Sequence, residues 1–175
     1  MPIKGKQLGL IAAAGSVTLL LAAFVFQALG YAPCALCIWQ RYPHAAAIVI
    51  GVFLTIGVAT LLLLISGAAA AATTAAIGVY HTGIERNWWE GPASCTGSGL
   101  DMSGLSGADL LPSASTGPST LVMCDDVAWE FLTLSMASWN VLWSSLLAAL
   151  WIMAAVTVWH EKRMPGTTGL SQTKG

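Results

Sequence analysis

Three long stretches without a charged residue constrain this chain more than any other feature. No Asp, Glu, Lys or Arg occurs between Lys6 and Arg41, between Arg41 and Glu85, or between Glu130 and Glu161. Charged residues make up 9% of the 175 residues, whereas a soluble domain has roughly 25%. Because about 20 apolar residues span the hydrocarbon core of a bilayer, these stretches predict transmembrane segments.

The lengths of the stretches predict four helices. The first and last stretch hold one helix each, and the middle stretch is long enough for two, with Ser66 and Gly67 as a turn signal near its centre. Backbone groups inside a bilayer need partners within their own segment, so we expect an all-α membrane bundle forming one domain over residues 1–175. The predicted helices lie at about 8–29, 44–65, 68–88 and 139–159, and the two outer loops at about 30–43 and 89–138.

The placement of Lys and Arg predicts the orientation in the membrane. Cytoplasmic segments carry an excess of these residues near the ends of transmembrane helices. Both termini are therefore predicted to be cytoplasmic, and the two outer loops to lie on the opposite side. The net charge of −1 gives no reason to expect a nucleic acid partner. The cations near the two termini are Lys4, Lys6, Lys162, Arg163 and Lys174.

All four cysteines fall in the two outer loops, in a compartment where disulfides form and persist. Cys34 and Cys37 form a C-x-x-C unit, in which the pKa of the attacking thiol is lowered. Closing so short a loop gains little chain entropy, so this pair favours a redox switch over a structural bridge.

Cys95 and Cys124 form the second predicted pair. A disulfide between them would lower the chain entropy of the unfolded protein and so stabilise the fold by roughly 3–4 kcal/mol. A structural disulfide is therefore a serious alternative. Gly, Pro, Ser and Thr supply 19 of the 30 residues from 91 to 120. Such a segment has little to fold around, and this favours cysteines that exchange partners.

Zinc binding is another use of a C-x-x-C unit, with His44 as a third ligand. An oxidising compartment is unfavourable for thiolate zinc, and Ile38 stands where attachment of a c-type haem needs histidine. We therefore expect no metal.

Arg41 lies four residues after Cys37, where the two side chains would share one face of a helix. A guanidinium there would stabilise a Cys37 thiolate. The alternative is an arginine that binds lipid headgroups. If Pro43 is the first residue of the second helix, Arg41 lies in the loop and the spacing argument weakens.

The segment PCALCIWQR, at residues 33–41, resembles the signature of the DsbB family of disulfide bond formation proteins. The segment CDDVAWEFLTLSMASWN, at residues 124–140, is also similar to the part of that family that precedes its fourth helix. The resemblance covers most of the chain. It implies an enzyme of the bacterial inner membrane that reoxidises a periplasmic DsbA-like dithiol protein and passes the electrons to a membrane quinone, either ubiquinone or menaquinone.

The resemblance also implies roles for individual residues. Cys95 would be attacked by the donor protein, and Cys124 would exchange with Cys34. Cys37 would lie beside the quinone, with Arg41 supporting it. The positions that match quinone-contacting residues of the family are Gln27, His81 and Met136, although a histidine or methionine in a membrane helix also serves in plain packing.

Two other interpretations remain open. A quinone oxidoreductase of the vitamin K epoxide reductase kind also couples a C-x-x-C unit and loop cysteines to a quinone, but there the unit precedes a late helix. A membrane scaffold with two structural disulfides would perform no chemistry.

Overall fold

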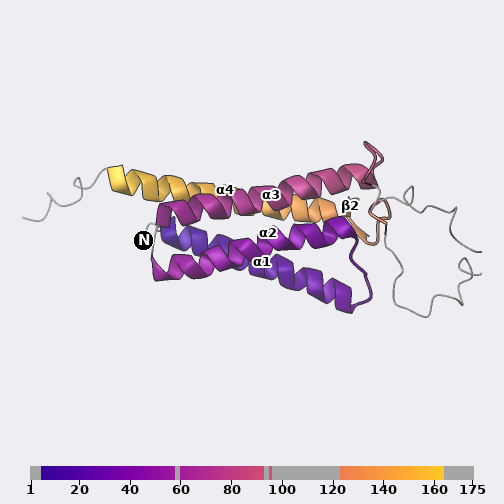
Figure 1. Ribbon diagram of the computed structural model, residues 1–175, viewed down its shortest axis with the longest axis horizontal. Coiled ribbons are helices and arrows are strands. Elements are labelled where there is room, and N and C mark those ends of the chain that lie inside the picture. The colour runs from indigo at the N-terminus through magenta and orange to yellow at the C-terminus, as the bar shows by residue number, and fades with distance from the viewer. Residues whose placement is uncertain (1–4, 58–59, 93–94, 96–122, 164–175) are drawn as a thin grey trace, which may run out of the picture.

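The computed structural model describes residues 5–57, 60–92, 95 and 123–163. Four long helices run along the long axis of the molecule, and a short hairpin precedes the last of them (Figure 1). This architecture confirms the predicted all-α membrane bundle. The elements are α1 (Gly5–Ala28), α2 (Ala35–Ile56), α3 (Thr60–Glu85), β1 (Glu130–Phe131), β2 (Leu134–Ser135) and α4 (Met136–Arg163).

The helices form a four-membered bundle in which each packs against two neighbours. Both α1 and α3 pack against α2 and α4, and they lie diagonally across the bundle from each other. The start of α2 and the hairpin lie at one end, which we call the cysteine end, and the start of α1 lies at the other (Figure 1). Toward the cysteine end, α1 diverges from the remaining helices (Figure 1).

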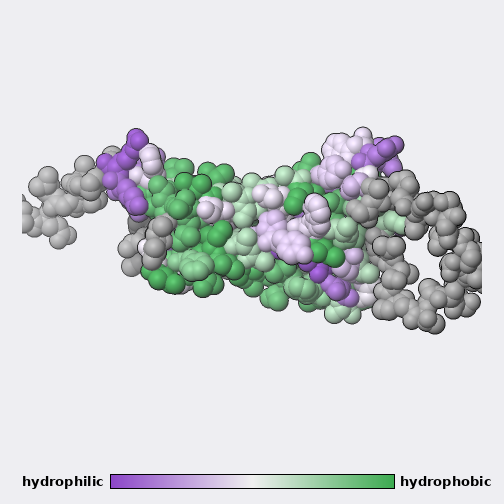
Figure 2. Space-filling view, viewed as in Figure 1, coloured by the Kyte–Doolittle hydropathy of each residue, from purple (hydrophilic) through white to green (hydrophobic). Residues whose placement is uncertain are grey.

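The outer surface of the bundle is apolar. Hydrophobic residues predominate over its middle, and hydrophilic residues gather near its two ends (Figure 2). The helices α1, α3 and α4 are each long and apolar enough to cross a membrane. The helix α2 has 22 residues but carries three polar residues in its first half, Gln40, Arg41 and His44. All three line the cavity described in the next subsection.

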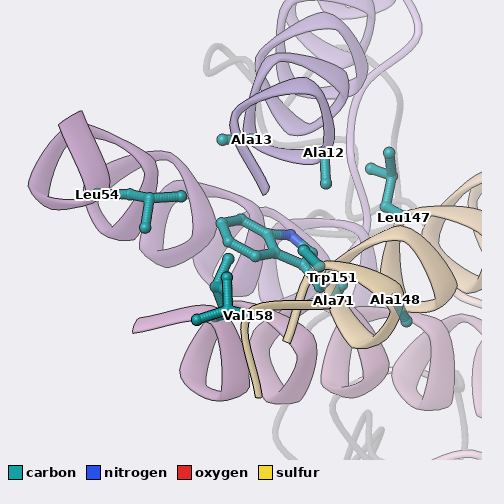
Figure 3. Packing of buried hydrophobic residues seen from close by; sticks show 10 residues of the cluster. Ala12, Ala13, Leu54, Ala71, Leu147, Ala148, Trp151 and Val158 are labelled. Atoms are coloured by element: carbon teal, nitrogen blue, oxygen red, sulfur yellow. The ribbon is translucent and has the colours of Figure 1, made fainter. Parts of the chain in front are cut away.

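Trp151 of α4 fills the centre of the bundle between the other helices (Figure 3). Its side chain is fully buried. A Cβ atom added to Gly67 of α3 would lie 2.6 Å from the Trp151 ring, and one added to Gly9 of α1 would lie 3.2 Å from it. The two glycines therefore create the space that this large side chain occupies.

The predicted turn at Ser66 and Gly67 is wrong, and so are the helices predicted at 44–65 and 68–88. The structure ends α2 at Gly57, whose φ of 82° suits glycine and whose N–H bonds the Leu54 carbonyl at 3.2 Å. Gly67 lies within α3, where its lack of a side chain serves packing against Trp151.

The second helix also begins earlier than predicted, at Ala35 rather than near residue 44. Cys34 caps it, because the Cys34 sulfur accepts a hydrogen bond from the Cys37 backbone N–H at 3.3 Å. Pro43 therefore lies inside the helix and does not begin it. Thr74 of α3 donates to the Gln40 carbonyl at 3.1 Å, which gives that carbonyl a partner close to the proline. The predicted loop 30–43 is correspondingly shorter.

The third helix ends at Glu85 rather than at residue 88. Asn87 has a φ of 56°, and the N–H groups of Asn87 and Trp88 bond the carbonyls of Ile84 and Gly83 at 3.0 and 2.8 Å. This is the double hydrogen bond of a Schellman C-cap, which stops a helix.

The last helix is longer than the predicted 139–159. It begins at Met136 because the Ser135 hydroxyl accepts a hydrogen bond from the Ser138 N–H at 3.2 Å, as an N-cap does. It ends in a turn with Lys162 and Arg163, whose positive charges suit the negative end of the helix dipole. The predicted loop 89–138 thus contains the hairpin and the start of α4, and its residues 96–122 lie outside the described part of the chain.

Candidate active site

Both cysteine pairs lie together at the cysteine end of the bundle. Cys95 and Cys124 form a disulfide with Cα atoms 4.9 Å apart. Cys34 and Cys37 are free thiols whose sulfur atoms lie 3.0 Å apart. Cys34, Cys95 and Cys124 belong to one buried cluster with Leu36 and Ile84, and Cys37 packs against it. The structure therefore brings together the four cysteines that the sequence places in two separate loops.

Cys34 lies in a position that favours its thiolate. It precedes the first turn of α2, where the helix dipole and free N–H groups stabilise negative charge. The Cys37 thiol and the Cys37 N–H both bond its sulfur, and Nε2 of His81 lies 3.5 Å away. The hydrogen bond from the Cys37 thiol, with a smaller effect from His81, holds the pKa of Cys34 well below its usual range, although burial opposes this shift.

His81 of α3 connects Cys34 to polar residues of α2, α3 and the hairpin. Its Nε2 atom also lies 3.8 Å from a carboxylate oxygen of Glu85, and its Nδ1 atom lies 3.1 Å from Nε2 of Gln40. The Ser135 hydroxyl donates to the other oxygen of Glu85. The sequence singled out His81 only by resemblance, and the structure places it in contact with a cysteine sulfur.

A buried row of hydrogen bonds continues from His81 into the bundle, and we call it the amide row. The Asn140 amide donates to Oε1 of Gln40 at 2.6 Å and lies 3.3 Å from the Thr74 hydroxyl. On its other side, Oδ1 of Asn140 lies 3.0 Å from Nε2 of His44 and accepts from Ser144 at 3.1 Å.

Sequence reasoning missed Gln40, Asn140 and Glu85 as site residues. One signal was present: polar pairs four residues apart, Gln40 with His44 and Asn140 with Ser144, occur in otherwise apolar helices. Polar side chains in a membrane helix face the bundle interior and usually mark a functional site.

Arg41 lies in α2 with Cys37, as the spacing argument requires, but its guanidinium contacts α1. One nitrogen donates to Oε1 of Gln27 at 2.7 Å and another to the Ala23 carbonyl at 3.4 Å. The guanidinium carbon lies 4.9 Å from the centre of the Phe24 ring. Arg41, singled out by its spacing from Cys37 as well as by resemblance, is thus hydrogen-bonded to Gln27, which was singled out by resemblance alone.

A cavity of about 290 Å³ adjoins these residues. It is lined by the second half of α1, the first turns of α2 and α4, and the segment around Met123 to Trp129. Its lining includes the part of α1 that diverges from the other helices in Figure 1. Cys34, Cys37, Arg41, His81 and Met136 all line it.

The sequence suggested His44 as a third metal ligand beside Cys34 and Cys37, but in the structure the histidine beside these two cysteines is His81. The donor atoms of Cys34, Cys37 and His81 all lie within 4.8 Å of one another. His44 is instead hydrogen-bonded to Asn140.

Comparison with known protein families identifies the chain. The model of the family described as "Disulfide bond formation protein DsbB" matches residues 5–154, a range that contains all four cysteines. No match was found among curated proteins or among solved structures. The chain therefore belongs to the DsbB family, and it is a membrane oxidoreductase that forms disulfide bonds.

Proposed function

We propose that this protein oxidises the dithiol of a periplasmic DsbA-like protein and delivers the electrons to a membrane quinone, either ubiquinone or menaquinone. One observation carries the proposal: two cysteine pairs and His81 meet in a buried cluster that adjoins an apolar cavity. A structural disulfide would not need a second, reduced pair beside it. Thiol–disulfide exchange does need one, because each step is an attack by a thiolate on a neighbouring disulfide.

The first exchange takes electrons from the donor. A donor thiolate attacks Cys95, the Cys95–Cys124 bond breaks, and Cys124 leaves as a thiolate. Cys124 then attacks Cys34 of an oxidised Cys34–Cys37 pair, and Cys37 leaves as a thiolate. Both Cys34 and Cys124 lie in the same buried cluster, so this attack requires only local movement.

The second exchange releases the oxidised donor. The second thiolate of the donor attacks the donor sulfur that is bonded to Cys95. This forms the donor disulfide and releases Cys95 as a thiolate. Cys95 then attacks Cys124, restores the Cys95–Cys124 bond and releases Cys34 as a thiolate. The outcome is a disulfide between Cys95 and Cys124 beside reduced Cys34 and Cys37, which is the pairing in the structure.

The environment of Cys34 favours electron flow in this direction. A stabilised thiolate favours the reduced dithiol, so the Cys34–Cys37 disulfide is readily reduced and acts as an oxidant. For a two-electron couple, about 30 mV changes the equilibrium tenfold. The capped position of Cys34 and its contact with His81 therefore help to draw electrons from the outer pair to the inner pair.

The cavity fits a quinone ring. Its walls are mainly apolar and include the aromatic side chains of Phe26, Trp139 and Trp143, which suit a flat ring. Cys37 lies on the wall, and Arg41 supplies a fixed positive charge that Gln27 orients. A bound quinone would accept two electrons and two protons as the Cys34–Cys37 disulfide forms again.

We also propose a location in the bacterial inner membrane, with both termini cytoplasmic and the cysteine end periplasmic. The support is the position of the cations. Lys6 precedes the apolar part of α1, and Lys162 and Arg163 end α4, at the end of the bundle opposite the cysteines. An excess of Lys and Arg marks the cytoplasmic side.

Steady-state assay of the purified protein in lipid nanodiscs tests the proposal. We expect a DsbA-like dithiol protein and a soluble quinone to react with one-to-one stoichiometry, followed through the optical absorbance of the quinone. The variants Cys37→Ser and Cys95→Ser should be inactive, whereas Ala69→Val, on an exposed position of α3, should retain activity. Quinone loss no faster with the wild type than with the two serine variants would indicate an inert scaffold.

A further inference from the structure

The amide row has a fixed direction, because only one assignment of its hydrogen atoms satisfies every partner. The Thr74 hydroxyl has a single hydrogen, and it goes to the Gln40 carbonyl, which can only accept. The Thr74 oxygen must therefore accept from Asn140, so the Asn140 NH₂ group lies on that side. This NH₂ group donates to Oε1 of Gln40.

The direction passes from Gln40 to His81. Since Oε1 of Gln40 accepts from Asn140, its NH₂ group faces Nδ1 of His81 and donates to it at 3.1 Å. A neutral imidazole has one donor nitrogen and one acceptor nitrogen. With Nδ1 accepting, the ring proton lies on Nε2.

The partners of Nε2 agree with this assignment. Nε2 faces the Cys34 sulfur at 3.5 Å and a Glu85 oxygen at 3.8 Å, and both are acceptors when charged. Because both lie at the same nitrogen, His81 does not relay a proton between them across its ring. Its second nitrogen is occupied by the Gln40 amide.

We propose that Gln40 and Asn140 are positioning residues that hold the His81 proton on Nε2, where it stabilises the Cys34 thiolate. The inference rests on the proposed function only in taking Cys34 as a reacting thiol. The amide row reaches across three helices: Asn140 lies in α4, Gln40 in α2, and His81 in α3. Rotation of the Gln40 amide would turn its Oε1 toward Nδ1 and draw the proton to that side, and Asn140 opposes this rotation by donating to Oε1.

The other charged and titratable groups near Cys34 do not replace this proton. From α2, the Cys37 sulfur lies 3.0 Å from the same sulfur, and its thiol donates to Cys34 once Cys34 is a thiolate. From α3, the Glu85 carboxylate faces Nε2 and would repel a thiolate. The remaining nearby cysteines, Cys95 and Cys124, are joined in a disulfide and do not titrate. His81 is therefore the one cation-forming neighbour of Cys34 among the contacts of the described residues.

The test measures the sulfur directly, without donor or quinone. Full-length protein in nanodiscs, with Cys34 and Cys37 reduced and the Cys95–Cys124 disulfide intact, is treated with iodoacetamide over a range of pH, and alkylation of Cys34 is followed by peptide mass spectrometry. Asn140→Leu and Gln40→Met replace each amide with an apolar side chain of similar size. We expect each to move the midpoint of the Cys34 profile upward by about one pH unit, a roughly tenfold loss of thiolate at low pH.

Thr73→Val is the control, since Thr73 is an exposed residue of α3 whose hydroxyl bonds the Ala69 carbonyl of its own helix rather than the amide row. We expect its profile to match that of the wild type. A second readout is the ¹⁵N chemical shift of the His81 ring, which can be assigned because the chain has 3 histidines. It should report a proton on Nε2 in the wild type and a mixture of both tautomers in Asn140→Leu.

Two results would overturn the inference. One is a Cys34 profile that stays in place in both Asn140→Leu and Gln40→Met. The other is a wild-type spectrum with the proton on Nδ1, a readout that does not depend on the folding of any variant. Failure of quinone reduction in the assay above, with these shifts observed, would instead overturn the proposed function alone.

Discussion

Hydrogen-bond donors surround the sulfur of Cys34. As a thiolate it accepts from the Cys37 thiol at 3.0 Å and from the Cys37 backbone N–H at 3.3 Å, and Nε2 of His81 lies 3.5 Å away. Hydrogen bonds to a charged form favour that form and lower the pKa of an acid. The reactive state of Cys34 should therefore persist in acid far below the range of an ordinary thiol.

This environment predicts the pH dependence of Cys34. Its lowered pKa means that the thiolate is present at neutral pH and is lost only as the pH falls through the lowered value. At pH 6 we expect reduced Cys34 to be alkylated nearly as fast as at pH 8, whereas a thiol with a pKa of about 8.5 would react roughly a hundredfold more slowly. Cys37→Ala removes the largest cause and should move the profile upward. A wild-type midpoint near 8.5 would contradict the assignment.

A second prediction at this scale concerns Arg41. Its guanidinium is held between α1 and the cavity by Gln27 and the Ala23 carbonyl. Arg41→Met should raise the KM for quinone at least about tenfold, since a hydrogen bond from a charged group contributes roughly 1.5–3 kcal/mol. Exchange between the donor and Cys95 should continue at the wild-type rate, which rapid-quench trapping measures. An unchanged KM would leave Arg41 as a residue that anchors the protein to lipid.

Packing at the level of helices depends on small residues opposite large ones. Gly67 of α3 faces Trp151 of α4, and an added Cβ would lie 2.6 Å from its ring. Gly67→Val should therefore destabilise the fold by roughly 1–3 kcal/mol, as overpacking of a dense core does. Ala69→Val adds similar bulk to an exposed position of the same helix and should leave the melting temperature unchanged. Equal melting temperatures for the two variants would show that the bundle opens to accommodate the side chain.

The number and class of the helices could be predicted from sequence because charge is excluded from a bilayer. The first helix, predicted at 8–29, is observed as Gly5–Ala28. The position of the turn between the second and third helices could not be predicted, because Gly57 and Gly67 both lie in the same uncharged apolar stretch and either could end a helix. The conformation of Gly57, with φ of 82°, and the contact of Gly67 with Trp151 exist only in the folded bundle.

Part of the site could likewise be predicted from sequence. The spacing of Cys34 and Cys37 indicates a redox-active pair, because a C-x-x-C unit lowers the pKa of its attacking thiol. The contacts of Gln40 with Asn140, and of Arg41 with Gln27, join residues that are far apart in sequence. Each arises from the way two helices pack, and no local pattern encodes such a partner.

At the scale of the whole molecule, both members of the outer disulfide are covered. Cys95 and Cys124 are 1% and 0% exposed, and Cys34 is 4% exposed. A donor protein can therefore attack Cys95 only after its sulfur becomes exposed, whereas Cys34 and Cys124 already share one buried cluster. Exchange between the inner and outer pairs should thus be possible without any partner protein.

Replacing Cys37 with serine tests this internal exchange. Without its local partner, the Cys34 thiolate should attack Cys124, forming a Cys34–Cys124 bond and releasing Cys95 as a thiol. With a protease site engineered after Gly57, between α2 and α3, acid-quenched Cys37→Ser protein should stay joined after cleavage on a non-reducing gel and separate with reductant. The double variant Cys34→Ser with Cys37→Ser should separate under both conditions, because its outer disulfide lies within one fragment. If the halves of Cys37→Ser also separate without reductant, while mass spectrometry finds the Cys95–Cys124 disulfide intact, the two pairs do not exchange. The cluster would then be a packing arrangement, and the relay proposed for this protein would have to be abandoned.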